Sequence, residues 1–345
     1  MERYEAPRCI NSTTKTHVCN AKDHQKALAV KKPDQALADY SPKDAKWDDE
    51  RAITQLMSEF LFEMERYEKW AERMNGCTRT LRFGELINME TGEINPKLVN
   101  AFFCHCRHCR ICDGRKVLVR MGRFRQQLPK IEQEHPKARW ILLTLTVPNP
   151  PVNELRSTLQ AMNKAWQRFS QRKAFKPVLG WIRATEVTQD KTRDDYAHPH
   201  FHVLLLVPQS MFGKSYVKHH EWLQLWRDCY RDQSITQVDV RAVKGGAMRG
   251  AVETLKAFNY SMKVDDLINR TPEWILEYME QVNHLRFMAA GGVLNDALKK
   301  IEEEVSTNEM LLMDDEKGGE VTKIVATSTW RPGERKYRMK TKKGD

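Results

Sequence analysis

The sequence predicts an α+β fold, in which helices pack on one face of an antiparallel or mixed β-sheet. Segments rich in β-forming residues alternate with amphipathic helical segments between residues 140 and 303. Two of the β-segments follow each other across a short polar loop, which is typical of an antiparallel hairpin. A group of cysteines and a basic helical segment precede this region. Together these patterns favour a sheet-centred domain with a smaller cysteine-rich unit upstream of it.

The N-terminal region divides into two parts. Residues 1–46 are polar and lack a sustained period, so we expect a disordered arm. Residues 47–135 form a unit with a helix at each end. Its first segment, 48–74, begins with acids and places apolar residues three and four apart, which predicts one amphipathic helix. A basic helix is predicted over 113–134, before Pro136.

Residues 136–304 form the predicted sheet domain. The strand at 140–147 stops at Pro148, and a helix follows over 151–172. The strands at 178–188 and 198–207 flank the polar loop and form the hairpin. The remaining predicted elements are a helix containing Trp222 and Trp226, a strand at 236–243, a helix at 248–265 and a helix pair within 273–303.

The C-terminal segment, residues 305–345, is predicted to be an acidic linker and a basic tail. The tail from Arg331 to Lys343 has seven Lys and Arg residues against one Glu. We expect it to be mobile and to add non-specific contacts to phosphate groups.

Composition narrows the class of protein. The chain has 345 residues and a formal net charge of +11, which favours a polyanionic partner, either nucleic acid or an anionic membrane surface. No apolar stretch approaches the roughly 18 residues of a membrane span, and the first residues lack the apolar core of a signal peptide. We therefore expect a cytoplasmic protein whose eight cysteines are reduced or bound to metal.

Five of the cysteines lie close together in the sequence. Cys104, Cys106, Cys109 and Cys112 fall within nine residues, and Cys77 lies 27 residues before the first of them. The spacing of Cys109 and Cys112 lets two thiolates bind one tetrahedral zinc ion, and Cys104 with Cys77 could complete a four-sulfur site. The alternatives are a redox-active dithiol and structural cysteines that bind no metal.

Three histidines alternate at the start of the second hairpin strand. His198, His200 and His202 point to one face of the strand, because side chains on a strand alternate. Imidazoles that project together from a rigid strand can bind a divalent metal. The alternative is a histidine-rich strand end that faces solvent.

An acid on the first hairpin strand could complete the site. Glu186 could lie across from His200 and His202, giving two imidazoles and one carboxylate around Mg²⁺ or Mn²⁺. Such an ion acts as a Lewis acid on a phosphoryl oxygen. The register of the hairpin is open at this point, and a shift by one residue would place Glu186 on the opposite face.

A nucleophile is suggested by the helix predicted at 248–265. Tyr260 and Lys263 are three residues apart and share a helix face. A phenol has a pKa near 10, so a nearby metal ion or lysine is needed to favour the phenolate. Taken alone, the pair is a weak signal, because most such pairs are a packed tyrosine beside a solvated lysine.

These motifs, in this order, resemble a known family. The strand at 142–146, the run HPHFHVLL at 198–205, Val238–Arg241 with Lys244, and Tyr260–Lys263 are similar to the plasmid rolling-circle replication initiators of the single-tyrosine type, within the HUH endonuclease superfamily. The cysteines upstream resemble that family's zinc-binding segment. The resemblance covers about residues 77–300 and implies an HUH-type central antiparallel sheet flanked by helices, with an upstream zinc-binding segment.

The resemblance implies a mechanism and partners. His200 and His202, with Glu186, would hold the catalytic metal, and His198 would have a supporting role. Tyr260 would attack one strand of a single-stranded or hairpin-extruded plasmid origin, leaving a 3′-OH primer and a 5′-phosphotyrosine. Lys263 would position the phosphate or the phenolate. A host helicase and a DNA polymerase are expected partners.

The sequence departs from the family pattern at two places. Related proteins often carry a glutamate four residues before the tyrosine, with a proposed role in the terminating cleavage. That position is Lys256 here, and Glu253 is the nearest acid on the predicted helix. The second departure is Cys106 together with Arg110 in the cysteine segment, where the family commonly has proline after the first cysteine of the pair. Zinc ligation by Cys106 in place of Cys104 stays open. The alternative function is a zinc-stabilised, non-catalytic DNA-binding regulator in which Tyr260 is dispensable.

Overall fold

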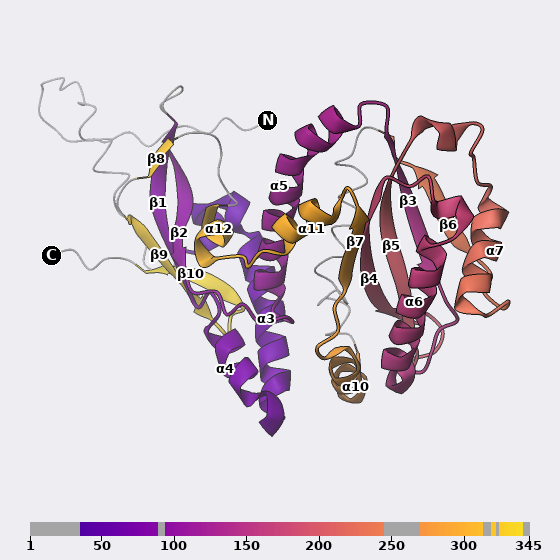
Figure 1. The fold of residues 1–345 in the computed structure, drawn as a ribbon. Helices are drawn as coiled ribbons and strands as arrows, with labels where there is room; N and C mark the ends of the chain where they lie inside the picture. Colours follow the sequence, from indigo (N-terminus) through magenta and orange to yellow (C-terminus); the bar gives the residue numbers. More distant parts are fainter. Residues whose placement is uncertain (1–34, 89–93, 245–269, 313–318, 322–323, 341–345) are drawn as a thin grey trace, which may run out of the picture.

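The computed structural model of the chain contains two antiparallel β-sheets with the long helix α5 (Arg110–Glu134) between them (Figure 1). The structure describes residues 35–88, 94–244, 270–312, 319–321 and 324–340. Helix α5 is the basic helix predicted over 113–134, and it begins three residues earlier. The α+β class is therefore confirmed.

The predicted sheet has five strands in the order β6-β3-β5-β4-β7. Every neighbouring pair is antiparallel, which settles the choice between an antiparallel and a mixed sheet. The predicted hairpin is present as β4 and β5. The strands are β3 (Arg139–Thr146), β4 (Gly180–Gln189), β5 (Ala197–Val207), β6 (Val238–Ala242) and β7 (Met288–Gly292).

Both faces of this sheet are covered, rather than one as the order of elements suggested. Phe201, Val203 and Leu205 on β5 belong to a core that contains the large aromatics of helices α6 (Leu155–Ser170) and α7 (His219–Tyr230). Leu204 and Leu206, which point the other way, belong to a second core with apolar residues of α5 and α11 (Asn295–Glu302). The unbroken apolar run of β5 reflects this burial on two faces.

Strand β7 lies where the sequence predicted a helix pair over 273–303. The segment forms α10 (Pro272–Val282), then β7, then α11. Two glycines make the strand possible: a Cβ at Gly291 would lie 2.4 Å from Nε1 of Trp181, and one at Gly292 would lie 2.2 Å from the Leu179 carbonyl oxygen. The close approach of β7 to β4, and the positive φ of Gly292, require residues without a side chain.

The second sheet was not anticipated from the sequence. Its main path is β10-β9-β1-β2, and β8 also pairs with β1. It joins residues near position 80 to the C-terminal segment, which lies beside them at the left of Figure 1. The strands are β1 (Thr80–Asn88), β2 (Ile94–Ala101), β8 (Gly319–Val321), β9 (Ala326–Arg331) and β10 (Lys336–Lys340).

The prediction of a mobile basic tail is wrong as far as residue 340. Trp330, Tyr337 and Met339 are buried, and they alternate with basic residues that point away from the core. The tail is therefore a hairpin with one apolar face, which its many charged residues masked in the sequence. The predicted arm over 1–46 is also too long, since Leu37 is buried and the N–H of Met339 donates to the Gln35 carbonyl at 2.9 Å. Residues 1–34 lie outside the described part.

The single helix predicted over 48–74 is two helices, α3 (Lys46–Phe62) and α4 (Glu68–Gly76). The backbone is extended at Met64, which breaks the helical path. The Oγ of Ser58 then donates to the Ala71 carbonyl at 2.8 Å, because α4 folds back against α3.

The docking of the C-terminal hairpin leads to a first prediction about the stability of the protein. The buried hydroxyl of Tyr337 donates to the Thr78 carbonyl at 2.7 Å, across 259 residues of sequence. Tyr337→Phe would leave that carbonyl without its partner and should lower the free energy of unfolding by about 1–2 kcal/mol in urea titrations. Tyr216→Phe is the matched control, since Tyr216 is 61% exposed. Equal stability of both variants would contradict the docking of the tail.

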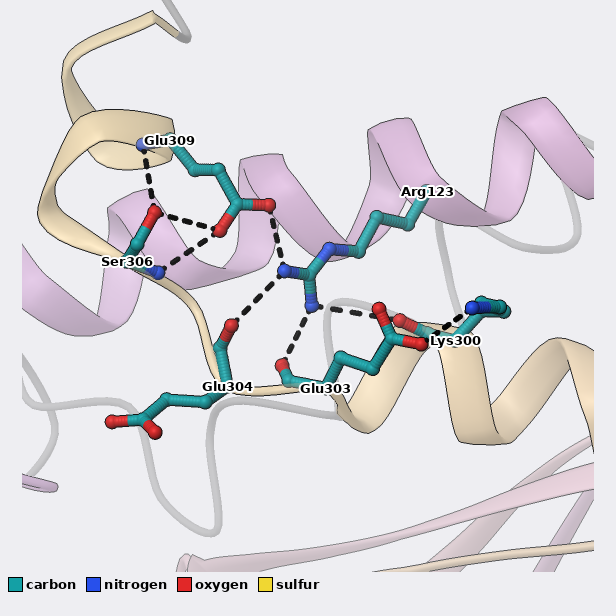
Figure 2. A network of polar contacts seen from close by, with 6 residues as sticks. All are labelled: Arg123, Lys300, Glu303, Glu304, Ser306 and Glu309. Atoms are coloured by element: carbon teal, nitrogen blue, oxygen red, sulfur yellow. Dashed lines mark hydrogen bonds and ion pairs between the residues drawn. The ribbon is translucent and has the colours of Figure 1, made fainter.

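A polar network fixes α5 to the chain after α11 (Figure 2). Arg123 donates to the carbonyls of Glu303 at 2.6 Å and Glu304 at 3.1 Å, and to Oε1 of Glu309 at 2.6 Å. Ser306 donates from its N–H and its hydroxyl to the other oxygen of Glu309. One guanidinium thus holds both the end of α11 and the start of α12 (Thr307–Leu312).

Loss of this network should also be measurable. We expect Arg123→Met to lower the free energy of unfolding by about 1–2 kcal/mol, because several charge-assisted bonds disappear at a side chain that is only 15% exposed. Arg125→Met, at an exposed position two residues along the same helix, should leave thermal unfolding unchanged. If both variants unfold together with the wild type, Arg123 does not fix the segment after α11.

Candidate metal centres and active site

The register of the β4–β5 hairpin brings Glu186, His200 and His202 to one place. Glu186 lies directly opposite His200, and Ala184 lies opposite His202, so the carboxylate and both imidazoles project from the same face. Oε2 of Glu186 is 2.8 Å from Nε2 of His202 and 3.0 Å from Nε2 of His200. The two Nε2 atoms are 3.0 Å apart. We refer to these three residues as the Glu-His-His group.

The separations of these donor atoms suit a six-coordinate ion. Oxygen or nitrogen ligands about 2.1 Å from an ion lie roughly 3.0 Å apart when they are adjacent in an octahedron. The three observed separations match that value, and three ligands on one octahedral face leave three positions open. The residues therefore fit Mg²⁺, Mn²⁺ or a similar divalent ion.

The tautomer of His200 also fits metal binding. Its Nδ1 lies 3.3 Å from the backbone carbonyl of His198, so the proton belongs on Nδ1 and the lone pair on Nε2. A metal-ligating histidine typically donates its other N–H to a carbonyl or carboxylate in this way.

The carboxylate of the group stays ionised. Burial raises the pKa of Glu186, but hydrogen bonds from His200 and His202, and the positive charge of these rings when they also carry a proton on Nε2, outweigh it, so the pKa lies well below its usual range. The three side chains are between 11% and 20% exposed, so they remain accessible from solvent. A negatively charged, reachable carboxylate between two imidazoles is a suitable cation site.

His198 does not join the group. Its Nδ1 lies 2.6 Å from Oδ1 of Asn149, and its ring centre is 5.1 Å from that of His200. The supporting role predicted for His198 stays a prediction, and the structure adds Asn149 as its partner. The threonines of β3 were also not singled out: Thr144 pairs with His202 and Thr146 with His200. Their alternation with leucines over 142–146 was the available signal.

The cysteines form a second group of possible ligands. Cys77, Cys104, Cys109 and Cys112 place their sulfurs within 4.8 Å of one another. Three of the separations are 3.6 Å: Cys77–Cys112, Cys104–Cys112 and Cys77–Cys109. Sulfurs about 2.3 Å from a tetrahedral zinc ion would lie roughly 3.8 Å apart, whereas a disulfide needs about 2.05 Å. The cluster fits a zinc ion.

The geometry favours Cys104 over Cys106 as the fourth ligand of such a site. Sγ of Cys106 contacts the Cys104 carbonyl at 3.6 Å, and it is not among the four clustered sulfurs. The four sulfurs also have neighbouring donors. The backbone N–H of His105 donates to Sγ of Cys112 at 3.3 Å, and Oγ1 of Thr54 lies 3.8 Å from Sγ of Cys109.

Burial and sulfur–sulfur contacts oppose each other in the metal-free cluster. Burial raises the pKa of the Cys77 thiol. Burial also opposes ionisation of Cys109, but hydrogen bonds from the other three cysteines lower its pKa below the ordinary value. A bound divalent ion would favour thiolates at all four positions.

The predicted nucleophile cannot be placed. Tyr260, Lys263 and Glu253, with the helix predicted at 248–265, lie outside the described residues. The nearest described part of that motif is β6 with Lys244, which is exposed.

Comparison with known proteins identifies the family. The model of a family described as "Replication protein" matches residues 95–338 of this chain. This span includes the Glu-His-His group, three of the four clustered cysteines and most of both sheets. The chain belongs to this family of replication proteins. The relationship to replication initiators expected from the sequence is therefore confirmed.

Individual replication proteins show the same relationship. The chain is 29% identical to "Protein rep" of Streptococcus pneumoniae serotype 2 (strain D39 / NCTC 7466) over 309 residues, which cover 87% of this chain and 93% of that protein. It is 29% identical to "Protein rep" of Bacillus amyloliquefaciens over 337 residues, covering 86% and 95%. A "Protein rep" of Bacillus sp is 36% identical over 182 residues, covering 52% and 57%.

No solved structure matches the chain significantly. Within the described ranges, no helix combines the length and apolar character needed to cross a membrane.

Proposed function

We propose that this replication protein is a metal-dependent, strand-specific DNA nickase and ligase that initiates plasmid rolling-circle replication in the cytoplasm. The observation that supports it most strongly is the Glu-His-His group on β4 and β5, with donor separations that fit an octahedral divalent ion. Together with the five-stranded antiparallel sheet, this group supports assignment of the domain to the HUH type.

The chemistry follows from the residues that the sequence supplies. A bound Mg²⁺ or Mn²⁺ would supply Lewis acidity toward a phosphoryl oxygen. Glu186 contributes a negative charge that favours the cation, and His200 and His202 contribute neutral nitrogen donors. The hydroxyl oxygen of Tyr260 attacks the phosphorus, and the bond from phosphorus to the 3′ oxygen breaks. The 3′ oxygen takes up a proton and becomes the primer end.

Two further residues have proposed roles in the same reaction. The ammonium of Lys263 stabilises the developing negative charge on the phenolate or the phosphate. Glu253 is the proposed acid of the terminating cleavage, since Lys256 occupies the position where related proteins carry glutamate. Attack by the free 3′-OH on the phosphotyrosine would reverse the bond exchange and rejoin the strand.

The cysteine cluster has a structural role in this proposal. Zinc bound by Cys77, Cys104, Cys109 and Cys112 would join the end of α4 to the start of α5. The net charge of +11 fits the single-stranded or hairpin-extruded origin DNA as substrate. A host helicase and DNA polymerase would then extend the 3′-OH.

The test is formation of a covalent adduct. The wild-type protein is incubated with Mn²⁺ and single-stranded oligonucleotides that tile the DNA around its gene, and protein–DNA species are separated under denaturing conditions. We expect one oligonucleotide to give an adduct, and Tyr260→Phe to give none. An adduct with Tyr260→Phe equal to that of the wild type would mean that another residue is the nucleophile. No adduct with either protein would favour the non-catalytic regulator.

A further inference from the structure

A polar cleft of about 370 Å³ lies next to the Glu-His-His group. It opens where β3 ends, where β5 begins and where residues 234–237 lead into β6. Two of its wall residues border the group: Thr146 pairs with His200 across the sheet, and the His198 ring centre lies 5.1 Å from that of His200. We call it the flanking cleft and define it by Thr146, Asn149, Arg193, His198, Thr236 and Gln237.

One wall of the cleft is held in place by Asp190. Its carboxylate accepts hydrogen bonds from Nδ2 of Asn149 at 2.7 Å and from a terminal nitrogen of Arg193 at 2.8 Å. The backbone N–H and the hydroxyl of Thr192 donate to its other oxygen. Hydrogen bonds from Asn149, Thr192 and Arg193 hold the pKa of Asp190 well below its usual range, so this carboxylate remains an acceptor.

The hydrogen bonds of Asn149 determine which ring nitrogen of His198 carries the proton. Because the amide nitrogen of Asn149 donates to Asp190, its Oδ1 must accept, and Nδ1 of His198 must carry the proton. With the proton on Nδ1, Nε2 is the ring nitrogen left to accept a hydrogen bond, and no group in the described ranges bonds it. The cleft therefore offers an oriented acceptor on an aromatic ring whose position is fixed.

The other walls supply complementary groups. Arg193 is about half exposed, and its guanidinium lies 3.7 Å from the centre of the Tyr196 ring, so it presents a positive charge at the cleft. Thr236 and Gln237 are exposed polar side chains, and Pro148 adds an apolar edge. Unpaired bases are recognised by this combination of ring surfaces, cations and hydrogen-bonding groups.

We propose that the flanking cleft binds one unpaired base of single-stranded DNA directly beside the scissile phosphate. The proposal rests on the proposed nicking function and adds the residues that read the DNA there. A cleft of this volume admits a single nucleotide and excludes a base pair with its two backbones. Its position next to His200 places that nucleotide beside the phosphate bound at the metal group.

The test compares oligonucleotides that lack single bases. The nick is first mapped with wild-type protein and Mn²⁺ on single-stranded DNA that carries the region around the gene. Oligonucleotides with one abasic site at each position around the nick are then compared by their initial rate of adduct formation. We expect one abasic position within about two nucleotides of the nick to slow the wild type by about tenfold.

Variants of the cleft show whether that base lies in it. Thr236→Trp fills the cleft from an exposed position, and it should slow reaction of the intact oligonucleotide by about tenfold. The same abasic site should then cause no further loss, because base and cleft act as one unit. Gln233→Trp introduces the same side chain three residues earlier, outside the cleft, and should behave as the wild type. Arg193→Gln is a second, smaller change. It should reduce the loss of rate that the abasic site causes at that position, and at no other position.

The possible failures are distinguishable. The wild type could nick DNA without any abasic site near the nick slowing the reaction, or the abasic site could slow Thr236→Trp and the wild type by the same factor. In either case the cleft does not bind the base, and the nicking function stands. If the wild type forms no adduct with any oligonucleotide, the proposed function and this inference both fail.

Discussion

Replacing His202 with alanine is expected to reduce the rate of metal-dependent nicking by about a thousandfold while the protein stays folded. Nε2 of His202 lies 2.8 Å from the Glu186 carboxylate and 3.0 Å from Nε2 of His200. Removal of one of three ligands would remove most of the stabilisation that a metal ion gives to a phosphoryl oxygen, several kcal/mol in typical enzymes. About 4 kcal/mol corresponds to a thousandfold in rate.

The matched control for this prediction is His220→Ala. His220 is exposed on α7 and lies outside the group, so its loss should leave the nicking rate unchanged. Thermal unfolding with and without Mn²⁺ gives a second readout. Mn²⁺ should raise the Tm of the wild type and of His220→Ala but not that of His202→Ala. Wild-type activity and a wild-type Mn²⁺ shift in His202→Ala would place the catalytic metal elsewhere.

Replacing Cys109 with serine is expected to remove bound zinc and to unfold the cysteine-rich unit. Cys109 is fully buried, caps the N-terminus of α5 and lies 3.6 Å from Sγ of Cys77. Structural zinc sites contribute roughly 10–16 kcal/mol of apparent binding free energy at neutral pH. This is comparable to the whole stability of a typical domain, about 5–15 kcal/mol. The expected result is less than one zinc per chain and loss of cooperative unfolding in the region of β1, β2 and α5.

Cys106→Ser is the control, because Cys106 lies in the same segment and is buried but stands outside the four-sulfur cluster. It should keep one zinc per chain, measured by mass spectrometry of the metal, and should unfold cooperatively. Loss of zinc from Cys106→Ser with retention in Cys104→Ser would reverse the assignment of the fourth ligand. Absence of zinc from reduced wild-type protein would contradict a zinc site altogether.

The hairpin that carries the histidines could be predicted from sequence because its signals are local. The β-forming residues of β4 and β5 are separated by a polar loop, and Pro148 ends β3. The position of Glu186 could not be predicted in the same way, because a shift of one residue in the register would turn its side chain to the opposite face. In the structure Glu186 pairs with His200, and the loop between the strands is held by the hydrogen bonds of Asp190.

The second sheet escaped prediction because its partners are far apart in sequence. Leu81 on β1 pairs with Ser328 on β9, and Tyr337 bonds to Thr78. The high charge of the C-terminal segment suggested a solvated tail, yet Tyr337 and Met339 are buried on either side of Arg338, as on a half-buried strand. Strand β7 was missed for another reason: its Ala and Gly residues are weak β-formers, and close approach to Trp181 selects them.

Peptide mapping of the adduct tests whether Tyr260 becomes covalently attached to DNA. The adduct formed with Mn²⁺ and a single-stranded origin oligonucleotide is digested with nuclease and trypsin, and the modified peptide is sequenced by mass spectrometry. Cleavage after Lys256 and Lys263 gives the peptide AFNYSMK, which contains one tyrosine. We expect the nucleotide remnant on Tyr260 of this peptide, joined through its 5′-phosphate. A remnant on any other residue, or a Tyr260 that stays unmodified while DNA is nicked, would contradict the account.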